Sequence, residues 1–206
     1  MEFGLNKKTK IYIAGHRGLI GSAFVRFFEK KGYTNLIVRD KIDLNLCSSK
    51  DTFSFFQKNK PEVVILAAGK VGGIIANRDF PFDFISENLS IQVNVINAAH
   101  KYGIKKLIFF GSSCMYPKNS FKPMTEDQIF TGDLESSSIA YATAKYSGVQ
   151  MCQAINQQFD SSSFISVIPN SVYGPNDNFD LNSSHVLSAL VRRIHEAKLN
   201  NLSSLL

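Results

Sequence analysis

Tyr141 and Lys145 have the residue types and the spacing of an acid–base pair. Residues four apart on a helix lie on the same face, so the phenol and the ammonium group would be neighbours. The positive charge would favour the phenolate and lower the pKa of Tyr141, which is about 10 in a free peptide. Tyr141 could then donate or accept a proton near neutral pH. Because Tyr-x-x-x-Lys is frequent by chance, this prediction depends on the elements around the pair.

Ser112 is a further candidate, because it follows the apolar run Lys106–Phe110 in the segment Gly111-Ser112-Ser113-Cys114. In open α/β sheets, ligands bind at the carboxyl ends of the strands. A hydroxyl at that edge could hydrogen-bond the carbonyl that Tyr141 protonates. We therefore predict that Ser112 and Tyr141 act on one substrate group.

The segment from Gly15 to Gly21 reads Gly-x-x-Gly-x-x-Gly and lies between an apolar run and an amphipathic stretch. In this position the first glycine allows a tight turn, the second lets the backbone approach a pyrophosphate, and the third lets the helix pack closely. The amides that open the helix would then face the phosphates. The pattern predicts a dinucleotide-binding loop.

The residues after the second apolar run indicate which dinucleotide binds. An acid at this point would accept a hydrogen bond from the 2′-hydroxyl of NAD, whereas an arginine would hold the 2′-phosphate of NADP. The sequence has Arg39-Asp40-Lys41, two cations around one acid. We predict NADP(H), with Arg39 or Lys41 at the phosphate, while Asp40 leaves NAD open as an alternative.

Apolar runs and amphipathic stretches alternate along the chain. The runs are apolar throughout, which is typical of strands buried on both faces, and they cover residues 10–14, 35–38, 62–68, 106–110 and 164–168. The spacing of apolar residues predicts helices over residues 18–31, 83–102, 140–159 and 185–199. This order predicts an α/β fold, a Rossmann-type doubly wound parallel sheet with helices on both faces, as one domain over residues 1–206.

The composition excludes several classes of protein. With 206 residues, 44% hydrophobic and 19% charged, the chain is typical of a globular domain, and no apolar run is long enough to span a membrane. Three separated cysteines predict neither a disulfide framework nor a metal site. The polar start, Met1–Lys10, predicts no signal peptide, so we expect a cytoplasmic protein. The net charge of +6 comes without a dense basic patch, so we predict no nucleic-acid partner.

Taken together, the motifs resemble those of the extended short-chain dehydrogenase/reductases and, within them, the GDP-L-fucose synthases. The segments that carry the resemblance are IAGHRGLIGSA (13–23), LAAGKVGGIIAN (66–77), FFGSSCMYPK (109–118), YATAKYSG (141–148), VYGPNDNF (172–179) and SHVLSALVRRIHEA (184–197). The resemblance implies an NADPH-dependent epimerase/reductase that converts GDP-4-keto-6-deoxy-D-mannose to GDP-L-fucose. Epimerisation at C3 and C5 would precede hydride transfer to C4. The sugar stays open, because enzymes that act on related GDP-6-deoxy-heptoses share these motifs.

The same resemblance implies a role for each reactive side chain. Tyr141 would protonate the C4 oxygen, Lys145 would tune Tyr141 and hold the nicotinamide ribose, and Ser112 would hydrogen-bond the C4 carbonyl. Cys114 and His185 would be the acid and the base that epimerise C3 and C5. The ordinary pKa values of a thiol and an imidazole, about 8.5 and 6.5, suit both groups to either task.

The resemblance also implies the binding residues. The nucleotide site would comprise the glycine loop, the residues after several strands, and parts of the catalytic segments. Its residues are Gly15, His16, Arg17, Gly18, Leu19, Ile20, Gly21, Arg39, Lys41, Ala67, Ala68, Phe110, Gly111, Ser112, Ser113, Lys145, Pro169, Asn170, Ser171, Val172 and His185. Arg193 would contact the GDP-sugar, whose pyrophosphate suits a guanidinium fork.

The sequence departs from the family pattern at two points. Members usually carry asparagine where this chain has Ser171, with Asn170 one place earlier. The resemblance also implies that members are longer and that the C-terminal domain that grips the GDP-sugar is largely absent from this chain, so we expect little or no turnover from this chain alone. Two alternatives follow: an inactive NADP-binding remnant, or a nucleotide-sugar 4-epimerase or dehydratase, which would not need Cys114 and His185. The resemblance further implies a homodimer through the helices at 83–102 and 140–159.

Overall fold

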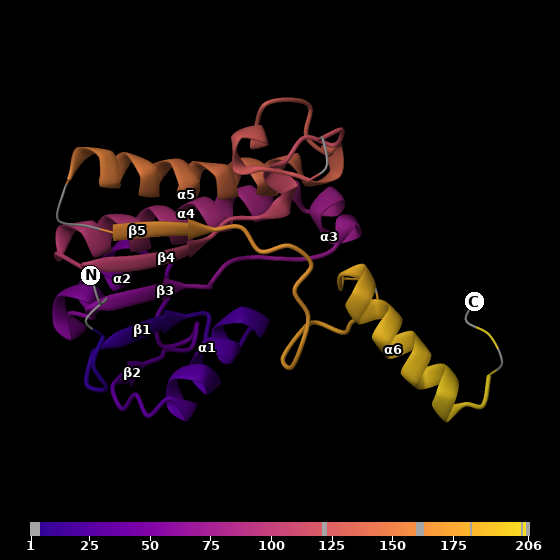
Figure 1. The fold of residues 1–206 in the computed structure, drawn as a ribbon, viewed down its shortest axis with the longest axis horizontal. Coiled ribbons are helices and arrows are strands. Elements are labelled where there is room, and N and C mark those ends of the chain that lie inside the picture. The colour runs from indigo at the N-terminus through magenta and orange to yellow at the C-terminus, as the bar shows by residue number, and fades with distance from the viewer. Residues whose placement is uncertain (1–4, 121–122, 160–162, 182, 203, 205–206) are drawn as a thin grey trace.

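A computed structural model of the protein describes residues 5–120, 123–159, 163–181, 183–202 and 204. The expectation for the first ten residues therefore lies partly outside the described residues. Figure 1 shows a layered arrangement in which a twisted sheet lies between helices, and one further helix, the last, extends away from the layers. The predicted α/β fold is confirmed.

Strands and helices alternate along the described chain. The strands are β1 (Ile11–Ala14), β2 (Leu36–Ile37), β3 (Val63–Leu66), β4 (Lys106–Phe110) and β5 (Ser163–Val167). The α-helices are α1 (Leu19–Lys30), α2 (Ser49–Asn59), α3 (Ile74–Asp79), α4 (Pro81–Lys101), α5 (Ile139–Gln158) and α6 (Val186–Leu199). Three short 3₁₀ turns, η1 (Ser113–Met115), η2 (Glu126–Gln128) and η3 (Ser136–Ser138), lie between β4 and α5.

The described strands form one parallel sheet in the order β2-β1-β3-β4-β5. From β1 the chain goes first to β2 on one side and then to β3 on the other, so the direction of winding reverses between β1 and β3. Ligands bind in open α/β sheets at such a reversal, beyond the carboxyl ends of the strands. Gly15 follows β1 and Ala67 follows β3, so both predicted binding segments lie at this edge.

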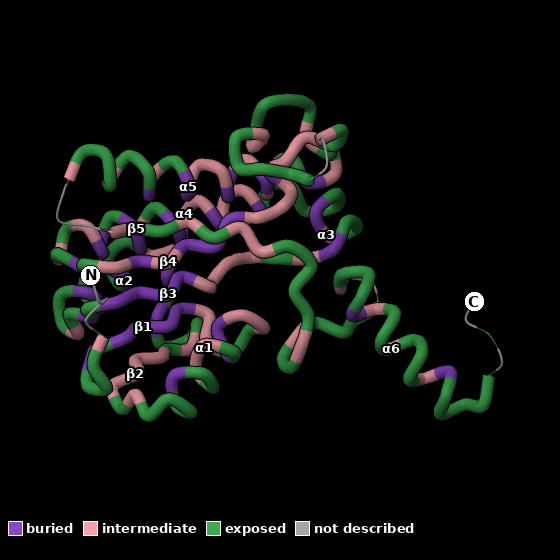
Figure 2. Tube along the Cα trace, in the orientation of Figure 1, coloured by how far each residue is buried: buried purple, intermediate pink, exposed green. Residues whose placement is uncertain are grey.

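Successive residues of β1 and β3 point to opposite faces of the sheet, and both faces are buried there. Tyr12 and Leu66 belong to a large core shared with α2, α4 and α5, whereas Ile13 and Ile65 belong to a smaller core against α1. Figure 2 shows the burial concentrated along these strands. The expectation of strands buried on both faces is confirmed for β1 and β3.

The same expectation is wrong for β5. Phe164 is 2% exposed on the face covered by α5, but the next residue, Ile165, is 47% exposed on the other face. Ile165 is exposed because the helix on its side of the sheet, α1, lies over β1, and no described helix covers β5 on that face. An apolar run therefore indicates a strand more reliably than it indicates two covered faces.

Two helices were not predicted. The signal for α2 was present, because Ser48 caps it by accepting a hydrogen bond from the backbone N–H of Asp51, and Thr52, Phe55 and Phe56 give its buried face. The sequence carried no such signal for α3, because its six residues are too few to show a helical period. This helix is supported by Asn77, whose side chain donates to the carbonyl oxygens at its N-terminal end.

The described residues have neither a membrane-spanning helix nor a cluster of metal ligands. No helix in this part of the chain has both the length and the apolar character needed to cross a bilayer. Among the same residues, no group of three or more histidine, cysteine, aspartate or glutamate side chains is placed to hold a metal ion.

Candidate active site

A cleft of ≈ 900 Å³ opens at the carboxyl ends of the strands. It is lined by the glycine loop, by the segments that follow β2, β3, β4 and β5, by the first turns of α5, and by the start of α6. All five predicted catalytic residues line it: Ser112, Cys114, Tyr141, Lys145 and His185. The fold therefore brings together in one cavity side chains that are far apart in the sequence.

The glycine loop has the geometry of an anion site. Gly15 has φ +81°, and a Cβ there would lie 2.7 Å from the backbone nitrogen of Ala68, while a Cβ on Gly21 would lie 2.1 Å from the carbonyl oxygen of Gly15. Gly18 caps α1 without a side chain, so the opening amides of the helix have no side-chain partner, and Leu19 and Ile20 line the cleft. Free amides at a helix N-terminus suit a pyrophosphate, so these residues fit a dinucleotide.

The cleft beyond β2 is rich in charge. The carboxylate of Asp40 contacts the guanidinium of Arg17, and it lies 3.6 Å from Nε2 of His16. Lys41 Nζ lies 2.8 Å from Oε1 of Glu87, on α4, and this hydrogen bond raises the pKa of Lys41. Arg39, which is exposed, donates to the backbone oxygen of Val38 at 2.6 Å.

Lys145 is buried on α5, with only 5% of its surface exposed. Its Nζ lies 4.9 Å from the centre of the Phe109 ring and 5.9 Å from the centre of the Tyr141 ring. Phe109 can occupy this position because Gly148 has no side chain. A Cβ on Gly148 would lie only 2.4 Å from the Phe109 ring. Burial lowers the pKa of Lys145 to about 8, so the ammonium form still prevails at neutral pH.

The expectation that Tyr141 has a lowered pKa is wrong for the structure as it stands. Burial raises its pKa, and the charge of a Cys114 thiolate raises it further, while a hydrogen bond with Ser112 acts in the opposite direction. Removing the phenol from water disfavours the phenolate more than the neighbouring hydrogen bond favours it. Tyr141 is therefore protonated at neutral pH, as a proton donor must be.

Cys114 belongs to the 3₁₀ turn η1, and its thiol is free. Its backbone N–H donates to Oγ of Ser112 at 3.2 Å, which ties the two candidate groups together. The turn is also held from outside, because the N–H of Phe130 donates to the carbonyl of Met115 at 3.0 Å. The Phe130 ring stacks on Tyr146 of α5 with a centroid distance of 4.2 Å, so η1 and α5 are fixed relative to each other.

Asn88 holds the segment after β3 against α4. This side chain is 2% exposed, and its amide donates to the backbone oxygens of Phe84 and Lys70 while its oxygen accepts from the N–H of Lys70. Gly69 permits this arrangement, because a Cβ there would lie 2.7 Å from the Asn88 oxygen. The wall of the cleft next to Lys145 is thus set by a residue that the sequence pattern did not indicate.

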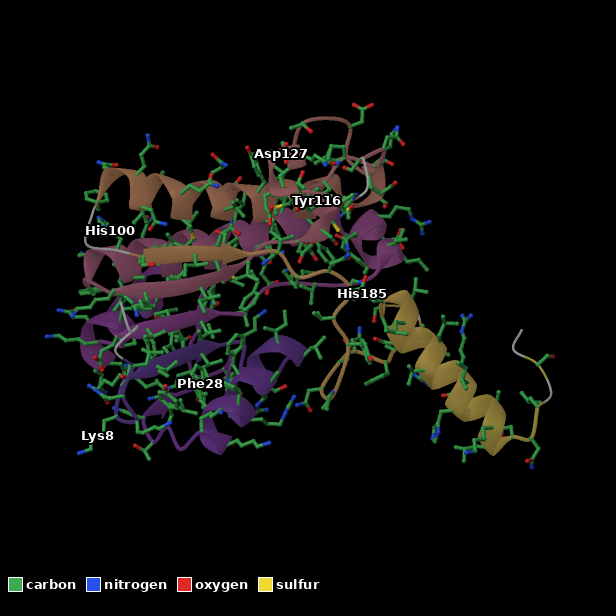
Figure 3. The ribbon with its side chains drawn as sticks, viewed as in Figure 1. Lys8, Phe28, His100, Tyr116, Asp127 and His185 are labelled. Carbon is green, nitrogen blue, oxygen red and sulfur yellow. The ribbon has the colours of Figure 1, made fainter. Side chains whose placement is uncertain are left out.

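His185 is the residue immediately before α6 and is exposed at the rim of the cleft. Figure 3 shows it at the end of α6 that lies nearest to the rest of the molecule. Polar contacts fix this end of the helix: the N–H of Gly73 donates to the oxygen of Ser183 at 2.9 Å, and the hydroxyl of Ser188 donates to the carboxylate of Asp177. His185 therefore depends on contacts between distant segments for its position.

Most of the predicted binding residues also line the cleft. Asn170 and Arg193 do not, and Arg193 is exposed on α6. Several lining residues were not predicted, among them Asp40, Cys47, Glu87, Asp177 and Ser188. Asp40 had a signal in its place after the second strand, and Asp177 and Ser188 lie within the segments 172–179 and 184–197 that carry the resemblance, while Cys47 and Glu87 come from segments with no recognised motif.

Comparison with known proteins places the chain in a family. The model described as the NAD dependent epimerase/dehydratase family matches residues 11–205. The chain belongs to this family. It is 51% identical over 195 residues to GDP-L-fucose synthase 1 of Arabidopsis thaliana, covering 95% of this chain and 60% of that protein. It is 45% identical over 194 residues to GDP-L-fucose synthase of Escherichia coli strain K12, covering 94% of this chain and 60% of that protein.

A comparison with a solved structure gives a similar result. The GDP-D-glycero-L-gluco-heptose synthase of Campylobacter jejuni, crystallised in the presence of NADPH, superposes with a TM-score of 0.90 at 42% identity, covering 95% of this chain and 57% of that one. The chain spans about 60% of the length of the curated relatives it matches.

Proposed function

We propose that the chain carries the reaction centre of an NADP(H)-dependent epimerase/reductase that converts GDP-4-keto-6-deoxy-D-mannose to GDP-L-fucose. The observation that supports this most is the single cleft, in which a pyrophosphate-binding loop lies beside Ser112, Cys114, Tyr141, Lys145 and His185. The identity of 45% and 51% to GDP-L-fucose synthases supports the choice of substrate.

The epimerisation is assigned to Cys114 and His185. The 4-keto group of the substrate acidifies the protons on C3 and C5, so a base can remove each proton and an acid can return it on the other face of the ring. The two side chains reach the cleft from different elements, Cys114 from the turn after β4 and His185 from the start of α6. Two groups that enter the cleft from separate elements suit a proton exchange between two faces.

The reduction is assigned to Tyr141, Ser112 and Lys145. The nicotinamide cofactor, when bound, supplies the hydride for C4. Tyr141, held protonated by burial, gives its proton to the C4 oxygen, and the Ser112 hydroxyl hydrogen-bonds that oxygen. Lys145 keeps its charge at neutral pH, and this charge stabilises the phenolate that remains and holds the nicotinamide ribose.

We extend the proposal to the substrate contact of Arg193, to the oligomeric state and to the location of the protein. Arg193, exposed on the helix that begins at the cleft, is assigned to the GDP-sugar. The chain is proposed to form a homodimer through the helices at 83–102 and 140–159. The two corresponding helices, α4 and α5, pack together, and Phe82 and Val93 of α4 are exposed. A cytoplasmic location is proposed from its three free cysteines.

The similarity to GDP-heptose enzymes supports a second class of substrate. Structures at 41–42% identity and TM-scores of 0.88–0.90 are GDP-heptose enzymes of Campylobacter jejuni, among them a C4 reductase with NADP bound. A GDP-6-deoxy-heptose would use the same reaction groups. The second candidate function is therefore a GDP-heptose epimerase/reductase.

The test follows both half-reactions in D₂O. The purified chain is incubated with NADPH and GDP-4-keto-6-deoxy-D-mannose, and NMR spectroscopy detects deuterium at C3 and C5 and the appearance of GDP-L-fucose. The turnover that the wild-type chain shows, however small, should lose the reduction in Tyr141→Phe while exchange continues, and it should lose the exchange in Cys114→Ala. Turnover that survives both substitutions would overturn the assignment, and NADPH binding without exchange or reduction would support the inactive remnant. Faster turnover of a GDP-4-keto-heptose would favour the second candidate.

A further inference from the structure

Gly72 and Gly73 belong to segment 66–77, one of those that carry the family resemblance, and the proposed function gives them no role. They form the turn that leads into α3, and Gly73 is the residue immediately before this helix. The backbone of Gly73 has φ −68° and ψ −177°, a conformation that any residue can adopt. The turn itself therefore does not require glycine at this position.

Glycine is required here by the close approach of another segment. A Cβ on Gly73 would lie 2.6 Å from the carbonyl oxygen of Ser184 and 3.4 Å from that of Ser183. The N–H of Gly73 donates to the Ser183 oxygen at 2.9 Å, so the two backbones meet directly. Figure 1 shows α3 beside the start of α6. His185 follows Ser184 in the chain, so the contact lies next to a group assigned to the epimerisation.

Asn77 fixes this turn from within α3. Its side chain is buried and donates to the carbonyl oxygens of Gly72 and Gly73 at 2.8 and 3.0 Å. Because both carbonyl groups are held, the turn is a fixed surface for the segment that docks on it. A side chain added at Gly73 would therefore displace Ser184 and, with it, His185.

The contacts of the segment that carries His185 differ in what they join. Asp180 accepts hydrogen bonds from the N–H and the hydroxyl of Ser183, and Asp177 accepts one from Ser188. These contacts lie within residues 177–188, so they fix the shape of the segment but not its place over the cleft. The hydrogen bond from Gly73 joins the segment to the chain that follows β3.

The neighbouring glycine faces a different reaction group. A Cβ on Gly72 would lie 3.1 Å from Cζ of Phe84 and 3.1 Å from Cβ of Ala76. The Phe84 ring meets the ring of Tyr141 edge-on, with a centroid distance of 6.0 Å. Gly72 thus packs toward the group assigned to the reduction, whereas Gly73 packs toward the group assigned to the epimerisation.

We propose that Gly73 is a positioning residue for the epimerisation, which sets the place of His185 relative to Tyr141. The proposal rests on the role that the proposed function gives to His185. Because Gly73 has no side chain, the backbone of Ser183 and Ser184 docks on the turn and holds His185 at the rim of the cleft. A methyl group at Gly73 would push this backbone away by about 0.8 Å, since ordinary contact begins near 3.4 Å. A misplacement of about 1 Å can lower a rate about 100-fold.

Two measurements on the purified chain test this for the wild type, Gly73→Ala, Gly72→Ala and His185→Gln. Two-dimensional NMR spectroscopy of the histidine side chains reports the surroundings of His185 without turnover, and the signal lost in His185→Gln identifies it. Deuterium incorporation from D₂O at C3 and C5 of GDP-4-keto-6-deoxy-D-mannose reports the epimerisation. Circular dichroism and NADPH titration show whether each variant keeps its fold and its nucleotide site.

We expect Gly73→Ala to shift the signal of His185 and to leave that of His100, which lies far from His185 in Figure 3. Any exchange that the wild type shows at C3 and C5 should fall at least about tenfold, while NADPH binding stays unchanged. A purely structural role would not separate the two. Gly72→Ala should leave the signal of His185 in place, because its methyl group meets Phe84 and Ala76.

Asn77→Ala is a second variant, which keeps the test decisive if Gly73→Ala does not fold. It adds no atom to the turn but frees the two carbonyl groups that Asn77 holds. The turn should then support the docked segment less firmly, and the same NMR signal of His185 should shift. Where the wild type shows no exchange, this signal alone decides.

Three results would overturn the inference. A folded Gly73→Ala variant whose His185 signal and exchange match the wild type does so and leaves the proposed function intact. An equal shift of that signal in Gly72→Ala also does so, because any change in the turn would then suffice. Exchange that survives in His185→Gln removes the role of His185, and the proposed epimerisation and this inference are then overturned together.

Discussion

The two faces of the sheet differ in how they are covered. On one face α2, α4 and α5 pack over β1, β3, β4 and β5, and the core there includes Phe164 of β5. On the other face the core against α1 takes residues from β1, β2, β3 and β4, and Ile165 of β5 is 47% exposed. Both residues belong to the same apolar run, so hydrophobicity alone does not decide which of them is buried; the helix above them does.

The candidate reaction groups also differ in how well the elements that carry them are covered. Tyr141 and Lys145 stand on α5, within the well-covered layer, while His185 stands before α6, which buries only Ser188 and Ala197. Figure 2 shows α6 exposed along most of its length. Segments with few buried contacts open at lower free energy than the core does. We therefore expect the groups assigned to reduction to be held more rigidly than one of the groups assigned to epimerisation.

The largest expected effect compares neighbours on β5. Phe164→Ala should lower the free energy of unfolding by about 3–5 kcal/mol, because it leaves a cavity in the covered core. Ile165→Thr keeps a β-branched side chain at an exposed position and should cost under about 1 kcal/mol. Urea denaturation followed by circular dichroism measures both. Equal losses would mean that the second face is covered in solution, and the comparison would fail.

The buried ammonium group of Lys145 gives the next effect. Its pKa is about 8 in the folded chain and 10.5 in water, so between these values the unfolded chain binds the extra proton, and stability rises with pH. From pH 7 to pH 9.5 the wild type should gain about 2 kcal/mol relative to Lys145→Met, as judged by urea denaturation at each pH. A difference between the two proteins that does not change with pH would show that Lys145 is solvated.

The contact that holds α6 should have a smaller and local effect. Ser188→Ala removes the hydrogen bond to the carboxylate of Asp177, which is worth about 1–2 kcal/mol. We expect faster amide hydrogen exchange along α6, with little change in the stability of the sheet. His195→Ala, at an exposed position of the same helix, is the control. A uniform loss of protection across the sheet would mean that α6 and the sheet unfold as one unit.

The smallest expected effect concerns Ser171, which has a left-handed backbone with φ +51°. Asparagine adopts this conformation more readily than serine does, so Ser171→Asn should raise the free energy of unfolding by a few tenths, up to about 0.5 kcal/mol. Ser171→Ala should lower it. Thermal unfolding of the three proteins, compared at one scan rate, gives the order. The reverse order would show that contacts of the side chain outweigh its backbone preference.

Much of the fold could be predicted from local patterns. The five apolar runs became the five described strands, and the glycine loop lies between β1 and α1, because strand hydrophobicity and helical period are properties of short segments. The boundaries were less certain: β2 is only Leu36–Ile37, since a ladder needs a partner strand at each position. The helix α3 was not predicted, because its support comes from the side chain of Asn77 and not from an apolar stripe.

The sequence by itself determined which reactive groups the chain has and the order of the elements that carry them. Ser112, Cys114, Tyr141, Lys145 and His185 were all predicted, and all line one cleft. Their electrostatic environment depended on the tertiary structure. Burial reversed the expected direction for the pKa of Tyr141, and the pairing of Arg17 with Asp40 and of Lys41 with Glu87 joined segments far apart in the chain. Burial and ion pairing depend on what lies nearby in space, and no local pattern records it.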